Sequence, residues 1–248
     1  MRASIRLSCV VAFCVLVLRA APAVAQSAER VVISVNGIQQ SGTSTVNSTV
    51  SFTANAEPAT FTSNFSVKSG PGFDAGARVH LRGAFGVSVS VSQFSSSGDA
   101  DVTAKIPHPF FFNQARSIAG TAGMKRDETV VRIALAVSST PGKKLQFAGF
   151  VGPAFFQVKQ DVVDSVTYTD SYPYDTAAFG KATTRTVSMS KTGFAAGADL
   201  AYFFAKKIGI GASVVVASAT MTTKASDGSS IDVTAGGTQL GAGLRFRF

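Results

Sequence analysis

Cysteine, tryptophan and histidine are scarce in this sequence of 248 residues. Tryptophan is absent, and the only two cysteines, Cys9 and Cys14, stand near the start of the chain. The remainder therefore has no disulfide framework and no cysteine-ligated metal site. His80 and His108 have no cluster of acidic or further histidine residues beside them, and no Gly-x-Ser-x-Gly motif is present. Metal centres need such clusters and serine hydrolases of this type need such a motif. We therefore expect no metal, no cofactor, no catalytic residue and no enzymatic activity.

A long apolar run is also missing after residue 25, which excludes a transmembrane helix there. The one sustained apolar stretch covers residues 9–18. Arg2 and Arg6 precede it, and the small-residue sequence Ala23-Val24-Ala25 follows. This pattern predicts a cleaved secretory signal peptide over residues 1–25, with the exported domain over residues 26–248. Removal of its three arginines lowers the net charge from +9 to +6. That excess is too small to indicate a nucleic-acid partner.

The chain instead alternates large apolar residues with small or polar ones. In residues 129–138, for example, Val131, Ile133 and Leu135 share one parity, while Arg132 and Ala134 share the other. A strand turns such sets to opposite faces. A membrane-spanning strand needs about 9–11 residues. Eight segments have roughly this length and pattern: residues 31–39, 73–82, 86–94, 129–138, 145–159, 193–204, 208–218 and 238–248.

The connections alternate in length. Residues 83–84, 140–144 and 205–207 are tight links, whereas long loops are expected between the first and second, third and fourth, and fifth and sixth segments. Short turns at one end and long loops at the other are typical of an all-β, eight-stranded, antiparallel up-and-down transmembrane β-barrel. A soluble barrel with the large residues inside is the alternative, but a face of Gly, Ala and Ser covers an exterior poorly.

Residues 41–70 allow two interpretations. Both 48–57 and 59–68 alternate, with short apolar runs and faces rich in Thr and Ser. The preferred prediction is that they extend the first two barrel strands as a hairpin. The alternative is an additional strand pair, which gives ten strands.

Most strand charges have the parity of the small-residue face. Inside a barrel, such charges must be paired or solvated. Asp199 is the acid expected to pair with an arginine, with Arg132 or Arg245 as the favoured partner. We predict a lumen charge network that fills the barrel, since eight strands leave room for little more than side chains. An anion passage is the alternative. The predicted network comprises Arg78, His80, Arg82, Arg132, Asp199, Arg245 and Arg247.

Two predicted loops are rich in aromatic residues. The stretch IPHPFFFNQ has prolines on both sides of its histidine and then three consecutive phenylalanines, and TYTDSYPYD carries three tyrosines. Exposed aromatic clusters mark binding sites, although they also pack against neighbouring loops or enter lipid interfaces. The candidate binding residues are His108, Phe110, Phe111, Phe112, Tyr168, Tyr172 and Tyr174.

The sequence resembles the small bacterial outer-membrane β-barrel proteins, the group of OmpA-, OmpX- and OmpW-like barrels. Three stretches carry the resemblance besides the layout, KSGPGFDAGARVHL, IPHPFFFNQAR and SYPYDTAAF, together with an alternating last strand that ends on Phe248. The resemblance implies that Leu244, Phe246 and Phe248 form the signal read by the barrel-assembly machinery. It brings no catalytic residues and no recognisable periplasmic domain.

These observations predict a protein of the cell outer membrane with an arginine-rich, occluded lumen and large extracellular loops. Its expected role is structural or the binding of a small solute or ligand. A conduit for small hydrophobic molecules, as in OmpW-like barrels, and a surface adhesin are the alternatives. The expected partners are outer-membrane lipid and lipopolysaccharide, with transient contact to the export and assembly machinery. We expect a monomer.

Overall fold

The computed structural model describes residues 30–41, 44–141 and 144–248, and they form one antiparallel sheet of ten strands. The predicted signal peptide, residues 1–25, lies outside the described residues. The described residues contain no helix long and apolar enough to span a membrane. The strands are β1 (Val31–Gln40), β2 (Thr45–Ala54), β3 (Glu57–Ser66), β4 (Gly70–Arg82), β5 (Phe85–Pro107), β6 (Ala115–Ser139), β7 (Leu145–Asp170), β8 (Ala177–Phe203), β9 (Ile208–Lys224) and β10 (Ser230–Arg247).

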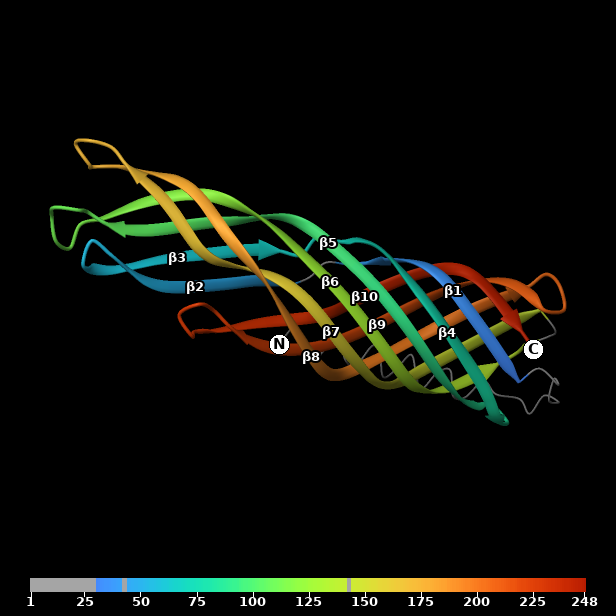
Figure 1. Cartoon of the computed structure of the whole chain (residues 1–248). Coiled ribbons are helices and arrows are strands. Elements are labelled where there is room, and N and C mark those ends of the chain that lie inside the picture. The colour runs from blue at the N-terminus through green and yellow to red at the C-terminus, as the bar shows by residue number, and fades with distance from the viewer. Residues whose placement is uncertain (1–29, 42–43, 142–143) are drawn as a thin grey trace, which may run out of the picture.

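Eight of these strands close into a barrel. Strand β1 pairs with β10 on one side and with β4 on the other, and the remaining neighbours follow in chain order from β4 to β10. The tilted strands wrap around a common axis in Figure 1. Each of the eight predicted segments lies within one strand of this ring, apart from Phe204 and Phe248, which follow the ends of β8 and β10. The prediction of an eight-stranded antiparallel barrel is therefore confirmed.

The expected long loops are instead mostly strand. Strands β5, β6, β7 and β8 have 23, 25, 26 and 27 residues, which is more than twice the length that a membrane crossing needs. The connections shrink to residues 108–114 between β5 and β6 and 171–176 between β7 and β8. The prediction of large loops was wrong because the distal alternation is mainly of polar with small residues, a pattern taken for loop composition.

Residues 45–66 form a separate hairpin. Strands β2 and β3 pair with each other along their whole length, and Thr60–Asn64 of β3 pairs with Asp101–Lys105 in the distal part of β5. The preferred prediction, an extension of the first two barrel strands, was wrong. The alternative of an additional pair is confirmed, although this pair lies outside the ring of eight.

The barrel has two regions with opposite polarity. The proximal segment is the end that carries the short turns, Arg30 and Phe248, and includes β6 from Val130 to Ser139. Most of its large apolar side chains point outward, whereas its interior is mainly polar, apart from a small buried cluster of Val32, Ala201 and Phe203. These exposed residues include Ile33, Leu81, Leu135, Val151, Phe194, Leu200, Ile210, Leu240, Leu244 and Phe248.

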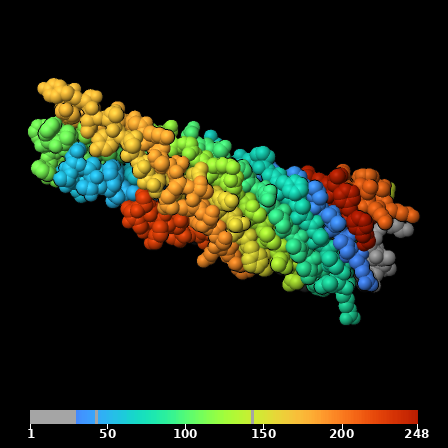
Figure 2. All heavy atoms as spheres, viewed as in Figure 1, coloured from blue at the N-terminus to red at the C-terminus, as the bar shows by residue number. Residues whose placement is uncertain are grey.

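The distal segment includes β6 from Ala115 to Thr129 and the β2–β3 hairpin. Its interior is an apolar core that includes Phe61, Phe65, Val102, Ile106, Val158, Val162, Ile231 and Val233. Its outer surface carries polar residues such as Thr121, Lys125, Gln157 and Lys159. Figure 2 shows the light-blue β2–β3, green β5–β6 and gold β7–β8 connections gathered at this end. The soluble-barrel alternative, with large apolar residues inside throughout, is wrong for the proximal segment.

Candidate functional site: the lumen network and the aromatic tip

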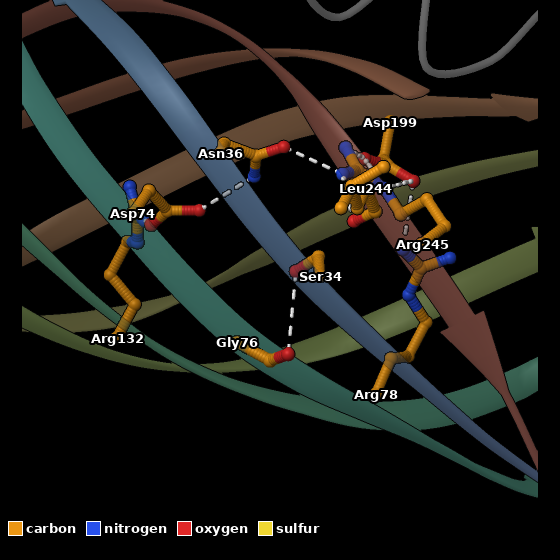
Figure 3. A network of polar contacts seen from close by, with 9 residues as sticks. All are labelled: Ser34, Asn36, Asp74, Gly76, Arg78, Arg132, Asp199, Leu244 and Arg245. Carbon is orange, nitrogen blue, oxygen red and sulfur yellow. Dashed lines mark hydrogen bonds and ion pairs between the residues drawn. The ribbon is translucent and has the colours of Figure 1, made fainter. Parts of the chain in front are cut away.

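The proximal lumen is centred on Asp199 of β8. Arg245 of β10 donates from Nη2 to Asp199 Oδ2 at 2.5 Å, and Arg78 of β4 donates from Nη2 to Asp199 Oδ1 at 3.2 Å. In the ring, β4 and β8 are separated by three strands on either side, so the Arg78 ion pair spans the barrel. All three side chains are at most 8 % exposed. Figure 3 shows the two guanidinium groups converging on the one carboxylate.

Asn36 links this cluster to a second ion pair. Arg245 Nη1 donates to Asn36 Oδ1 at 2.6 Å, and Asn36 Nδ2 donates to Asp74 Oδ1 at 3.1 Å. Arg132 of β6 donates from Nη2 to Asp74 Oδ2 and from Nε to Ser90 Oγ. The amide of Asn36 therefore accepts from one charge pair and donates to the other, as the dashed lines in Figure 3 show.

The network continues into the distal segment through two glutamines. Arg132 Nη1 donates to Gln239 Oε1 at 3.0 Å, and Gln239 Nε2 donates to Gln40 Oε1 at 2.7 Å. Gln40 Nε2 in turn donates to the carbonyl of Gly236 at 3.2 Å. Gly236 and its neighbour Gly237 have φ of 94° and 132°, a region that L side chains rarely enter.

A buried ion pair ends the chain of contacts. The amide of Gly236 donates to Glu128 Oε1 at 3.0 Å, and Arg126 Nη2 donates to Glu128 Oε2 at 3.0 Å and to the carbonyl of Thr234 at 2.8 Å. The side chains of Arg126 and Glu128 are 2 % and 1 % exposed. The hydrogen bonds thus run without a break from Asp199 to Arg126, along the interior of the barrel.

This network fills the lumen. Charges removed from water are stable only when they are paired and hydrogen-bonded. Here each carboxylate has at least one arginine partner and every carboxylate oxygen accepts a hydrogen bond. The cavity beside the network has a volume of about 40 Å³. That volume holds about two or three water molecules.

Several predicted lumen residues lie elsewhere. Arg82 is exposed at the end of β4, and Arg247 lies at the rim, where it stacks 4.2 Å from the Phe203 ring and donates to the carbonyl of Lys206. His80 is half-buried and its Nδ1 has no hydrogen-bond partner among the described residues. The expectation that Arg82 and Arg247 join the charge network was wrong, because they lie at the end of the barrel that carries the short turns, whereas for His80 it stays a prediction.

Sequence reasoning missed two acids, Asp74 and Glu128, and all three linking amides, Asn36, Gln40 and Gln239. Asp74 has the parity of Arg78 in the segment 73–82, so the alternation alone could have found it as a second strand acid. It takes Arg132, one of the two partners favoured for Asp199. Arg126 was missed because it lay within a stretch interpreted as loop, and Glu128 because it lay at the end of that stretch. No signal in the sequence pairs Gln40 with Gln239.

The distal tip holds most of the predicted loop candidates. Phe110, Phe111 and Phe112 are 68 %, 57 % and 75 % exposed, and Tyr172 is 88 % exposed. The Phe110 ring contacts the Tyr174 ring with centroids 5.3 Å apart, so the loops 108–114 and 171–176 meet there. The structure thus brings together five aromatic residues from two loops.

Arg116 of β6 and His108 hold this tip together. Arg116 donates to the carbonyls of Pro107, Tyr174 and Thr176 and pairs with Asp170 at 2.5 Å. His108 is buried, and its Nδ1 accepts hydrogen bonds from the backbone amides of Phe110 and Phe111. His108 therefore shapes the loop and is not an exposed ligand group. Tyr168 was also wrongly placed at the tip, since it packs against the distal core from β7.

Comparisons with known proteins agree with this architecture. The family model described as "Outer membrane protein beta-barrel domain" matches residues 10–248. No curated protein is similar enough in sequence to match. The fold is similar to that of the outer membrane protein OprG of Pseudomonas aeruginosa, with a TM-score of 0.54 and 10 % identity over 90 % of this chain and 97 % of that one.

Two further solved barrels match with lower scores. Neisserial surface protein A has a TM-score of 0.44 at 7 % identity over 88 % of this chain and 97 % of that one. The attachment invasion locus protein Ail of Yersinia pestis has a TM-score of 0.40 at 14 % identity over 90 % of this chain and 100 % of that one.

Proposed function

Because the chain belongs to the outer-membrane protein β-barrel domain family, we propose that it is a non-conducting barrel that carries a rigid extracellular binding tip. The supporting observation is the unbroken hydrogen-bond network from Asp199 to Arg126, which lies inside the barrel. In this proposal the function resides on the outer surface of the barrel, and the barrel carries out no catalytic step.

The orientation of the barrel follows from its surface. The outward apolar residues of the proximal segment match the hydrocarbon layer of the outer membrane, and the polar outside of the distal segment matches water. The distal segment then stands above the outer leaflet, next to lipopolysaccharide. In this orientation Leu244, Phe246 and Phe248 lie at the periplasmic end, where the assembly machinery would read them.

The distal segment suits a platform that presents a binding surface. Its apolar core gives it a rigid interior, and the burial of each Phe or Val side chain contributes about 1.5–3 kcal/mol. Arg116 fixes the two aromatic loops to each other, so the exposed phenylalanines need little ordering when they bind. A ligand-binding or adhesive role at the tip is the function that this geometry favours.

A lateral conduit for small hydrophobic molecules is the second candidate. The pairing of β8 with β9 runs only from Phe203–Gly209 to Phe194–Ser218, and β8 beyond Phe194 pairs with β7. The backbone pairing between β8 and β9 therefore ends at this level, although the Arg185 side chain of β8 donates to the carbonyl of Lys224 in β9 farther along. Against a conduit, Met189, Met221 and Ala219 are buried behind the unpaired stretch, which leaves the route filled.

Planar-bilayer recording of the refolded protein tests the proposal. Heat-modifiable gel mobility first establishes that the barrel is folded, and we then expect no steady conductance in wild type. A steady ohmic conductance in folded wild-type protein contradicts the closed barrel.

A second experiment tests the tip. Replacing Phe110, Phe111 and Phe112 with serine should abolish adhesion of whole cells to surfaces that wild-type cells bind, while the matched triple change of Thr121, Gln157 and Thr186 to alanine should not. Equal loss in both variants contradicts a role of the tip.

A further inference from the structure

The three arginines of the proximal lumen differ in how completely the protein satisfies them. Arg132 donates through Nε, Nη1 and Nη2, and Arg245 does the same. Arg78 is only 7 % exposed, yet its Nη1 is buried without a hydrogen-bond partner among the described residues. Leaving a charged donor unsatisfied in a low-dielectric interior costs free energy. A group that is not part of the chain would remove this cost.

The unsatisfied arginine lies on the lumen cavity. Arg78 lines this cavity of about 40 Å³, and the other lining side chains include Ser213 of β9 and Ser90 of β5. Hydroxyl groups and a guanidinium are hydrogen-bond donors that suit an anion. The carboxylates of Asp74 and Asp199 also line the cavity, but each of their oxygens already accepts a hydrogen bond from a side chain of the network.

The net charge of the buried network favours a bound anion. At neutral pH the proximal network has three arginines, Arg78, Arg132 and Arg245, against two aspartates, and the distal pair of Arg126 with Glu128 is neutral. One positive charge therefore remains uncompensated inside the membrane-embedded part of the barrel. An uncompensated buried charge is costly, and a counter-ion held beside Arg78 compensates it.

We infer that the lumen cavity binds one small monovalent anion of halide size, with Arg78 Nη1 as its principal donor. The small volume of the cavity favours an ion of halide size over a larger anion. The anion is a structural counter-ion of a closed barrel and not a permeating ion. The inference rests on the lumen cluster alone, so it holds whether or not the aromatic tip binds a partner.

The test measures thermal unfolding of the refolded barrel, read by heat-modifiable mobility at pH 8, where the nearby His80 is neutral. Sodium chloride or bromide is titrated against sodium methanesulfonate, whose anion is bulkier than a halide, at equal ionic strength. We expect a saturable rise in the wild-type midpoint with halide only. At about five times the dissociation constant the rise should be roughly 2–4 °C.

Two variants isolate Arg78. Arg78→Gln removes the unsatisfied nitrogen and the excess charge but leaves Asp199 paired with Arg245, and it should abolish the halide-specific rise. Arg82→Gln removes the same charge from an exposed position on the same strand and should retain the rise. Identical wild-type curves in halide and methanesulfonate overturn the inference, and so does a rise that persists in Arg78→Gln.

A crystallographic measurement on wild type keeps the inference falsifiable if Arg78→Gln does not refold. Crystals of the refolded barrel grown in sodium bromide should show an anomalous difference peak within hydrogen-bonding distance of Arg78 Nη1. The absence of such a peak, with ordinary water at that position, overturns the proposal.

Discussion

The proximal and distal segments solve the same folding problem with opposite polarity. In the proximal segment the lumen holds Asp199, Arg78 and Arg245, while Leu135 and Val151 face outward. In the distal segment Phe61 and Phe65 lie inside, while Lys125 and Lys159 face outward. The same long strands pass through both. The difference teaches that alternation alone does not determine which face lies inside, because the surrounding solvent changes from lipid to water along each strand.

A specific set of hydrogen bonds marks the transition between the two segments. Arg126 and Glu128 lie inside at the level where β10 departs from ordinary strand geometry at Gly236–Gly237. The Glu128 carboxylate accepts a hydrogen bond from the Gly236 amide, and the Gln40 side chain donates one to the Gly236 carbonyl. Buried backbone N–H and C=O groups need hydrogen-bond partners. At Gly236, where the backbone geometry is unusual, two side chains provide them.

The largest effect should come from removing the shared carboxylate of the proximal lumen. Asp199→Ala leaves Arg78 and Arg245 without their ionic partner in the membrane-embedded interior, and breaking such a pair costs about 3–5 kcal/mol. We expect a clear fall in the urea concentration at which the barrel loses its heat-modifiable mobility. Asp127→Ala, which removes the exposed partner of Lys125, is the control and should change it little. Equal stability of Asp199→Ala and wild type would show that the network does not hold the barrel.

A smaller and local effect is expected in the distal core. Phe61→Ala leaves a cavity under the β2–β3 hairpin and should destabilise the distal segment by about 3 kcal/mol. Because the proximal segment has its own polar interior and lipid-facing surface, heat-modifiable mobility should remain while limited proteolysis cuts within residues 45–66. Thr62→Ala, an outward position on the same strand, serves as the control. Simultaneous loss of both regions would mean that they unfold as one unit.

The smallest effect concerns the contact between the hairpin and the β9–β10 loop. The Ser229 side chain, together with the backbone amides of Ser51 and Ser229, lowers the pKa of Asp227 from 3.8 to about 2. A lowered pKa means that the folded state favours the carboxylate, so its stabilising contribution is present above pH 3.8 and is lost as the pH falls through about 2.

Hydrogen exchange measures this contact. Protection of the Ser51 amide, corrected for the intrinsic pH dependence of exchange, should decrease between pH 5 and 2, and Asp227→Asn should remove that step. Asp232→Asn, a change of another exposed acid in β10, should leave the step in place. Protection that does not change with pH in wild type would contradict the role of the Asp227 carboxylate.

Local sequence patterns were sufficient for the proximal strands but not for the contacts inside them. The strict alternation in 129–138 and 238–248 predicts strands because the side-chain period of a strand is two. Parity also places Arg132, Asp199 and Arg245 on one face. Which arginine meets which acid depends on barrel shear and on β4 facing β8, and neither has a local signature. Arg132 therefore pairs with Asp74, and Arg78 reaches Asp199 across the lumen.

The sequence by itself determined the ring of eight strands, the lipid-facing surface of the proximal segment and the polar character of its lumen. These follow from residue type and parity, which are properties of each strand alone. Only the tertiary structure decided that the strands continue into a second, apolar-cored segment, that residues 45–66 attach to β5, and that Arg116 joins the two aromatic loops. Those features depend on contacts between residues far apart in the chain, where the free energy of burial and of buried hydrogen bonds, and not local propensity, selects the partner.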